Sequence, residues 1–155
     1  MDTVTTTTRR FWLMGALMLP LAAMAAAPQG IKMEVWKDPS CGCCKDWIAV
    51  MKKAGFSVQV FETGNNGMRA QMGLSTQLGS CHTARVAGYV VEGHVPAREI
   101  HRLLREKPDA IGLTVPGMKV GSPGMDGPIY KGRKDPYQVL LVRRDGSTSV
   151  YQKYA

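Results

Sequence analysis

Three of the four cysteines of this 155-residue chain lie within four consecutive positions, as Cys41, Cys43 and Cys44, and the fourth, Cys81, is followed by His82. A thiolate is both the nucleophile of disulfide exchange and a ligand for soft metal ions. Three thiols in so short a stretch are more than the packing of a core requires. The sequence therefore indicates either a redox site or a soft-metal site.

The redox interpretation rests on Cys41 and Cys44, which form a C-x-x-C motif between an apolar run, residues 31–36, and an amphipathic run, residues 47–54. A strand that leads through such a turn into a helix is the thioredoxin arrangement. The unpaired N–H groups and the partial positive charge at a helix N-terminus favour thiolate over thiol. A thiol-disulfide oxidoreductase with Cys41 as nucleophile and Cys44 as resolving cysteine is therefore one hypothesis.

Cys43 has no task in such an enzyme and favours a metal site. Two structural disulfides would require one bridge between near neighbours, which closes almost no loop and so adds little stability. A zinc site made of Cys41, Cys44, Cys81 and His82 would also leave Cys43 idle. Copper(I) prefers thiolate and thioether ligands, and one thiolate can bridge two ions, so the crowded cysteines favour more than one copper(I) ion.

Two methionines are further candidate ligands. Met118 and Met125 each end a Pro-Gly-Met tripeptide in a loop rich in glycine and proline, residues 112–136. Thioethers bind copper(I) and cannot form disulfides. The alternative is that both side chains are apolar anchors that hold the loop to the domain.

The three histidines differ in their expected roles. His82 adjoins Cys81 and is a candidate ligand, or a residue that orients one. His94 follows Gly93 at the end of a predicted strand, where it either caps the turn or approaches the site. His101 lies on the polar face of a predicted helix and is expected to be exposed to solvent.

The hydrophobic periodicity predicts the elements that position these residues. Alternating side chains predict strands over residues 31–36, 57–62 and 83–92. Apolar side chains at helical spacing, Cys44 to Met51, predict a helix that ends at Gly55. The first two strands and this helix form a βαβ unit, in which the strands are parallel.

Further elements follow from the same reasoning. Pro96 opens a predicted helix that Pro108 ends, and residues 63–80 are expected to hold one short helix. Strands over 137–142 and 149–154 flank Asp145-Gly146, which is a strong hairpin signal.

The first 27 residues are typical of an export signal. Arg9 and Arg10 precede an apolar run, residues 11–23, and a small-residue cleavage site. We expect residues 1–27 to be a signal peptide and residues 28–155 to be one periplasmic domain that is not in the membrane, the alternative being an uncleaved anchor. The net charge is +8, but the basic residues are scattered, which argues against nucleic-acid binding.

Several motifs, in the same order, resemble the CopG-like family of periplasmic copper-resistance proteins. They are residues 41–44, 80–83, 88–96, 115–118 and 121–125. The resemblance covers residues 31–154 and implies a thioredoxin-like fold, copper bound through the cysteines, and a part in copper tolerance by redox conversion of copper ions. Lys119 departs from the pattern, because proline is expected after the first loop methionine.

These observations predict an α/β fold, with a thioredoxin-like mixed sheet, flanking helices and a long loop rich in Gly, Pro and Met. The predicted function is that of an exported protein that contributes to copper resistance by holding several copper(I) ions in a redox-active site. Its expected partners are copper ions and other periplasmic copper-handling proteins. The predicted ligands are Cys41, Cys43, Cys44, Cys81, His82, Met118 and Met125. The alternative function is a periplasmic thiol-disulfide oxidoreductase that uses Cys41 and Cys44.

Overall fold

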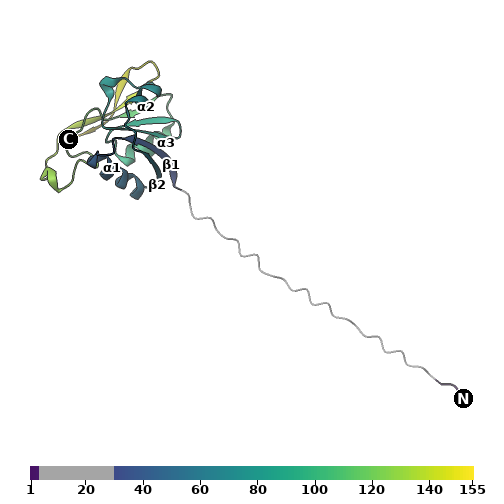
Figure 1. Ribbon diagram of the computed structural model, residues 1–155. Coiled ribbons are helices and arrows are strands. Elements are labelled where there is room, and N and C mark those ends of the chain that lie inside the picture. Colours follow the sequence, from purple (N-terminus) through teal and green to yellow (C-terminus); the bar gives the residue numbers. More distant parts are fainter. Residues whose placement is uncertain (4–29) are drawn as a thin grey trace.

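The computed structural model describes residues 1–3 and 30–155 (Figure 1). The predicted cleavage site, and all of the predicted signal peptide except its first three residues, lie outside the described residues. In the described part of the chain, no helix is long and apolar enough to cross a membrane.

A single seven-stranded mixed sheet organises the domain, in the order β2-β1-β3-β4-β5-β6-β7. The strands β1 and β2, which the helix α1 connects, pair with each other in parallel, and this confirms the predicted βαβ unit. The last two strands form the hairpin predicted around Asp145-Gly146. The strands are β1 (Ile31–Lys37), β2 (Phe56–Phe61), β3 (His82–Val86), β4 (Tyr89–Glu92), β5 (Gly112–Thr114), β6 (Tyr137–Val142) and β7 (Thr148–Tyr154).

Three helices, α1 (Gly42–Lys53), α2 (Asn66–Gln71) and α3 (Ala97–Glu106), flank the sheet. Helices α1 and α3 bury apolar side chains in the main core, together with Val91 of β4. Val90, which precedes Val91 in β4, belongs to a smaller cluster with Leu74 and Met72, two residues that follow α2. Successive side chains of a strand point to opposite faces, so these clusters lie on the two sides of the sheet. The mixed α/β sheet with flanking helices is confirmed, while its likeness to thioredoxin stays a prediction.

The prediction of one strand over residues 83–92 is wrong. The segment is a β-hairpin, in which β3 and β4 pair antiparallel. Ala87 and Gly88 form its two-residue turn, with φ values of 47° and 87°. Such turns require positive φ at both central residues and are usually signalled by Asn-Gly or Asp-Gly, so Ala-Gly gave a weak signal.

Three smaller expectations also need correction. The predicted loop 112–136 begins with the strand β5 and contains a 3-10 turn, Pro128–Tyr130. The segment 63–80 holds a second 3-10 turn, Thr76–Leu78, besides α2. His101 is only partly exposed, because its ring stacks on Phe56 and its Nε2 donates a hydrogen bond to the carbonyl of Ala54 at 3.0 Å.

Candidate metal centre

The four cysteines meet at the N-terminus of α1. Their sulfur atoms all lie within 4.8 Å of one another. Cys41 and Cys44 form a disulfide, whereas Cys43 and Cys81 are free. The Sγ of Cys43 lies 3.6 Å from that of Cys41 and 3.9 Å from that of Cys81. The structure thus brings together all four of the predicted cysteine ligands.

The turn that carries Cys41 is held by the end of β1. Lys37 is buried, and its Nζ donates to the carbonyl of Asp38 at 2.7 Å and to the Glu62 carboxylate at 3.0 Å. The Asp38 carboxylate accepts a hydrogen bond from the backbone N–H of Ser40 at 2.8 Å, and the hydrogen bonds from Ser40 lower the pKa of Asp38. These contacts fix the turn from which α1 starts, at the end of the helix that carries its partial positive charge.

A second group of candidate ligands shares Cys81 with the first. The donor atoms of Cys81, His82 and His94 also lie within 4.8 Å of one another. The Cys81 sulfur is 3.5 Å from Nδ1 of His82 and 3.1 Å from Nε2 of His94. The four sulfur atoms and two imidazoles therefore form one continuous cluster, with Cys81 at its centre.

The imidazole of His94 is oriented as in metal-binding histidines. Its Nδ1 lies 2.8 Å from the carbonyl of Pro123. A carbonyl can only accept, so Nδ1 carries the proton and Nε2 presents a lone pair toward Cys81. A backbone carbonyl on the second nitrogen is the usual way in which a ligating histidine is fixed in one tautomer.

His82 differs from His94, because its second nitrogen lacks an acceptor. Its side chain is completely buried, and its Nε2 has no hydrogen-bond partner among the described residues. A buried polar group without a partner costs about 1–3 kcal/mol. Its ring lies 4.3 Å from that of Trp47 and 5.1 Å from that of His94, measured between centroids. The residues fit a metal ion through Nδ1 of His82, Nε2 of His94 and the Cys81 sulfur, which can offer lone pairs of neutral imidazole and thiolate.

Burial sets the protonation states of these groups. It lowers the pKa of His82 well below the usual value, with His94 adding to the shift, and it also lowers the pKa of His94. Both rings are therefore neutral near pH 7, as ligation requires. Burial, reinforced by Cys43, raises the pKa of the Cys81 thiol to about 12. Without metal this thiol keeps its proton.

The loop 112–136 packs directly over the first turns of α1. At Gly124, a side-chain Cβ would lie 2.6 Å from the Trp47 backbone nitrogen and 2.8 Å from the Cys43 carbonyl oxygen. Only a glycine allows this approach, because φ is also +80° there. Together with the hydrogen bond of His94 to Pro123, this contact places the loop beside the metal-ligand cluster.

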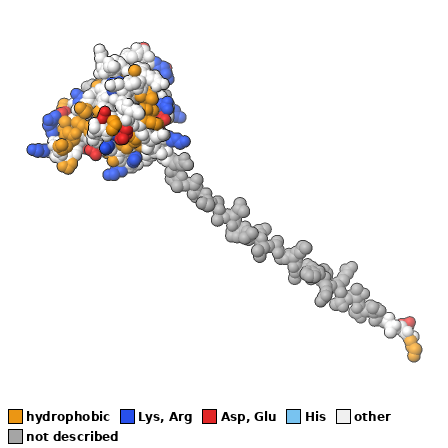
Figure 2. Space-filling model, in the orientation of Figure 1, with side chains coloured by type: hydrophobic (Ala, Val, Ile, Leu, Met, Phe, Trp, Pro, Cys, Tyr) orange, Lys and Arg blue, Asp and Glu red, His pale blue; other side chains and the backbone are white. Residues whose placement is uncertain are grey.

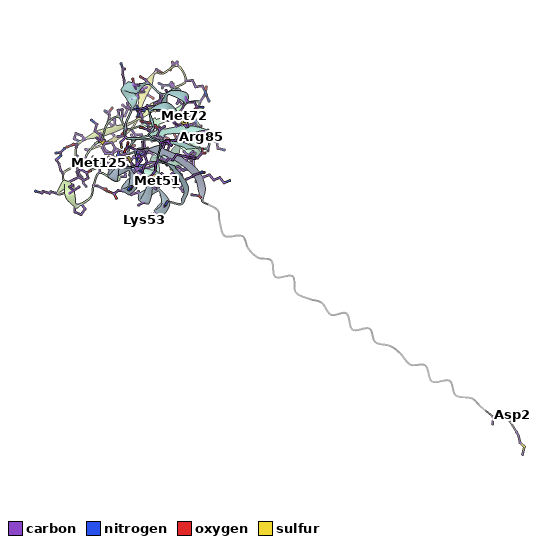
Figure 3. The ribbon with its side chains drawn as sticks, in the orientation of Figure 1. Asp2, Met51, Lys53, Met72, Arg85 and Met125 are labelled. Atoms are coloured by element: carbon purple, nitrogen blue, oxygen red, sulfur yellow. A yellow bond between two sulfur atoms is a disulfide. The ribbon has the colours of Figure 1, made fainter. Side chains whose placement is uncertain are left out.

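The two loop methionines have different environments. Met125 is 6% exposed, and its sulfur accepts a hydrogen bond from the Tyr130 hydroxyl at 3.1 Å. Partial desolvation raises the pKa of that hydroxyl, with Cys43 among the smaller causes, so this pair lies near the cysteines. Met118 is 59% exposed. Figure 3 shows Met125 on the side of the domain where the loop projects, away from Met72. The roles of Met118 and Met125 as ligands stay predictions.

His94 is the residue that the sequence reasoning did not commit to. The feature that could have identified His94 is the β3–β4 hairpin. In its register Thr83 lies opposite Glu92, so that His82 lies opposite Gly93. The backbone N–H of Gly93 donates to the His82 carbonyl at 3.0 Å, so His94 lies next to Cys81. Reading residues 83–92 as one strand hides this proximity.

The family of this chain follows from its similarity to known proteins. The model of a family described as "Protein of unknown function, DUF411" matches residues 78–125, which hold Cys81, His82, His94 and most of the loop. No protein of curated function matches the chain.

Two solved structures of "Copper resistance protein copG", in its Form 2 and its Form 1, are similar over most of the chain. Each is 42% identical and covers 81% of this chain. The match spans 99% of the Form 2 chain with a TM-score of 0.75, and 98% of the Form 1 chain with a TM-score of 0.74. This degree of identity over nearly the whole of a relative shows common descent, and the chain is therefore a member of the CopG family of copper resistance proteins.

Proposed function

We propose that this protein contributes to copper resistance by holding more than one copper(I) ion at the cluster of four cysteines and two histidines. The observation that carries the proposal is the position of Cys81, whose sulfur belongs to both groups of candidate ligands. Thiolate sulfur can bridge two ions, so a shared cysteine favours a site with several ions. The CopG structures supply the link to copper resistance.

The Cys41–Cys44 disulfide makes the capacity of the site depend on redox state. A disulfide sulfur carries no charge, so in this form the anionic ligands come only from Cys43 and Cys81. Addition of two electrons and two protons converts the disulfide to two thiols, which can ligate after losing their protons. We infer that the reduced protein holds more copper(I) than the disulfide form.

The same couple supports redox conversion of copper as a reaction of this site. Oxidation of the Cys41 and Cys44 dithiol to the disulfide releases two electrons and two protons. These electrons reduce two copper(II) ions to copper(I), so the reaction is balanced. In this proposal copper is the substrate, and the neighbouring Cys43, Cys81 and His94 receive the product.

Anaerobic titration with copper(I) tests the proposal. The fully reduced protein should bind more than one ion per chain, and Cys43→Ser should remove more than one equivalent, because a bridging thiolate serves two ions. The disulfide form should bind fewer. Saturation at one ion per chain, with no effect of Cys43→Ser, would contradict a multinuclear site.

A thiol-disulfide oxidoreductase is the second candidate, and the Cys41–Cys44 disulfide at the N-terminus of α1 favours it. Reduction of insulin measures this activity. We expect at most slow turnover, since Cys43 and the two histidines have no role in dithiol exchange. Full activity in the Cys43→Ser and His82→Ala variants, at the rate of a dedicated enzyme, would favour this candidate instead.

Export to the periplasm completes the proposal and rests on the leader-like residues 1–27. Copper-handling proteins of the same compartment are then the partners that deliver or accept the ions. Intact-mass measurement of protein from the periplasmic fraction tests this part. A mass that includes residues 1–25 would contradict cleavage.

A further inference from the structure

A buried ion pair lies behind the segment that carries Cys81. Arg69 of α2 and Glu92 of β4 are joined by a hydrogen bond of 2.9 Å from Nε to Oε1, and both side chains are buried. Burying two charges costs free energy that their attraction only partly returns, so stability alone is weak grounds for such a pair. Its contacts indicate a different use.

Both side chains hold the backbone of Ser80, the residue before Cys81. The Glu92 carboxylate accepts the N–H of Ser80 at 2.6 Å. Nη2 of Arg69 donates to the carbonyl of Ser80 at 2.9 Å, and the Asn65 side chain donates to the same carbonyl at 3.2 Å. Buried side chains thus bind both peptide groups that flank Ser80, the second of which leads into Cys81.

The guanidinium group of Arg69 packs against Gly79, where any side chain would clash with it. At Gly79, a side-chain Cβ would lie 2.6 Å from Nη1 of Arg69. The other oxygen of Glu92 accepts a hydrogen bond of 2.6 Å from the Thr83 hydroxyl, so the carboxylate cannot turn away from Ser80. Arg69 meets its two acceptors with two nitrogen atoms held in one rigid plane, a fixed geometry that the flexible ammonium group of lysine lacks.

We propose that the Arg69–Glu92 pair is a positioning device for Cys81. Acting through Ser80, it holds the Cys81 sulfur where Cys43 and His94 can share a metal ion with it. The inference rests on the proposed function, since it assigns the pair a purpose in copper binding. Arg69 and Glu92 bind the backbone next to the candidate ligand Cys81, and in this proposal neither side chain contacts the metal.

The diagnostic variant is Arg69→Lys, which keeps the positive charge beside Glu92 but replaces the rigid pair of nitrogen donors to Glu92 and Ser80 with one ammonium nitrogen. The matched control is Arg85→Lys, the same substitution at an arginine of β3 that pairs with Glu34 of β1 at the surface. Asn65→Ala is a milder second variant that removes one of the two donors to the Ser80 carbonyl, together with a hydrogen bond to the Thr83 hydroxyl, and changes neither member of the ion pair. It keeps the test decisive if Arg69→Lys does not fold.

Two measurements are needed. In the metal-free disulfide form, peptide mass spectrometry follows alkylation of Cys81 relative to Cys43. In the reduced protein, competition with a copper(I) chelator gives the affinity. We expect Arg69→Lys to raise the rate of alkylation of Cys81 relative to Cys43 severalfold. It should also lower copper(I) affinity by about 10- to 100-fold, as substitutions of residues that support metal ligands do. Asn65→Ala should produce smaller changes of the same sign, and Arg85→Lys none.

Wild-type alkylation ratios and affinities in folded Arg69→Lys and Asn65→Ala would overturn the inference. The same would follow if Arg85→Lys changed both quantities as much. Failure of the proposed function looks different. The wild type would then bind no copper(I), while the alkylation ratios would still report whether the pair holds Cys81.

Discussion

The Cys81 sulfur and Nε2 of His94 lie 3.1 Å apart, although 13 residues separate them in the sequence. The β3–β4 hairpin produces this contact, because its two strands return the chain to the point where Cys81 precedes His82. The Pro123 carbonyl, in the loop, then fixes the proton of His94 on Nδ1. One contact thus depends on the hairpin and on the loop together, and it links the cysteines to the histidines.

Removal of the His94 ring is expected to weaken copper binding. His94→Ala removes a lone pair beside Cys81, and copper(I) affinity should fall by about tenfold or more, in the range of substitutions that disturb metal ligands. Competition with a copper(I) chelator measures this loss. His101→Ala is the control, because His101 contacts Ala54 and Phe56 outside the cluster. Equal affinities in the two variants would remove His94 from the ligand set.

The close packing of the loop on α1 can be tested at Gly124. Gly124→Ala introduces a Cβ only 2.6 Å from the Trp47 nitrogen at a residue with positive φ. We expect it to lower the free energy of unfolding by about 1–3 kcal/mol, the cost of a strained backbone residue, and to lower copper affinity as the loop moves. Gly127→Ala is the matched control, because nothing lies within 4 Å of its Cβ. Chemical denaturation compares them, and equal stabilities would argue against the contact.

Copper(I) affinity should rise with pH, because the Cys81 thiol, with its pKa raised to about 12, must lose a proton on binding. Each proton released raises the apparent affinity by about tenfold per pH unit while the pH is below that pKa. His82 and His94 contribute no slope above pH 7, since their pKa values are lowered and they are already neutral. Chelator competition between pH 7 and pH 9 measures the slope. A flat profile would show that no buried thiol is deprotonated.

The loop methionines are tested by replacement with leucine, which keeps apolar volume and removes sulfur. If they are ligands, the double variant Met118→Leu and Met125→Leu should bind copper(I) more weakly. Its metal-free stability should change by less than about 1.5 kcal/mol, as for other volume-conserving replacements. Met51→Leu in the core is the control. Unchanged affinity, with a loss of stability confined to Met125→Leu, would leave Met125 as an apolar anchor.

The basic residues on the visible surface are distributed, not gathered into one stripe (Figure 2). The absence of nucleic-acid binding stays a prediction.

Short-range patterns were sufficient to predict much of the fold. Alternation over residues 31–36 and helical spacing from Cys44 to Met51 reflect contacts between neighbours in sequence, so they predicted β1 and α1 correctly. Asp145-Gly146 likewise marked the last hairpin. The spacing of three cysteines at a strand-to-helix turn located the cysteine cluster, because residues within one helical turn of each other lie close together in space.

The sequence by itself therefore determined which residue types are candidate ligands and the element that carries most of them. Only the tertiary structure decided which distant residues join them. His94 reaches Cys81 through a hairpin whose Ala87-Gly88 turn carries a weak local signal, and Glu92 meets Arg69 through burial of two charges that hydrophobic periodicity does not report. Such contacts depend on strand register and on packing between segments, which no local pattern encodes.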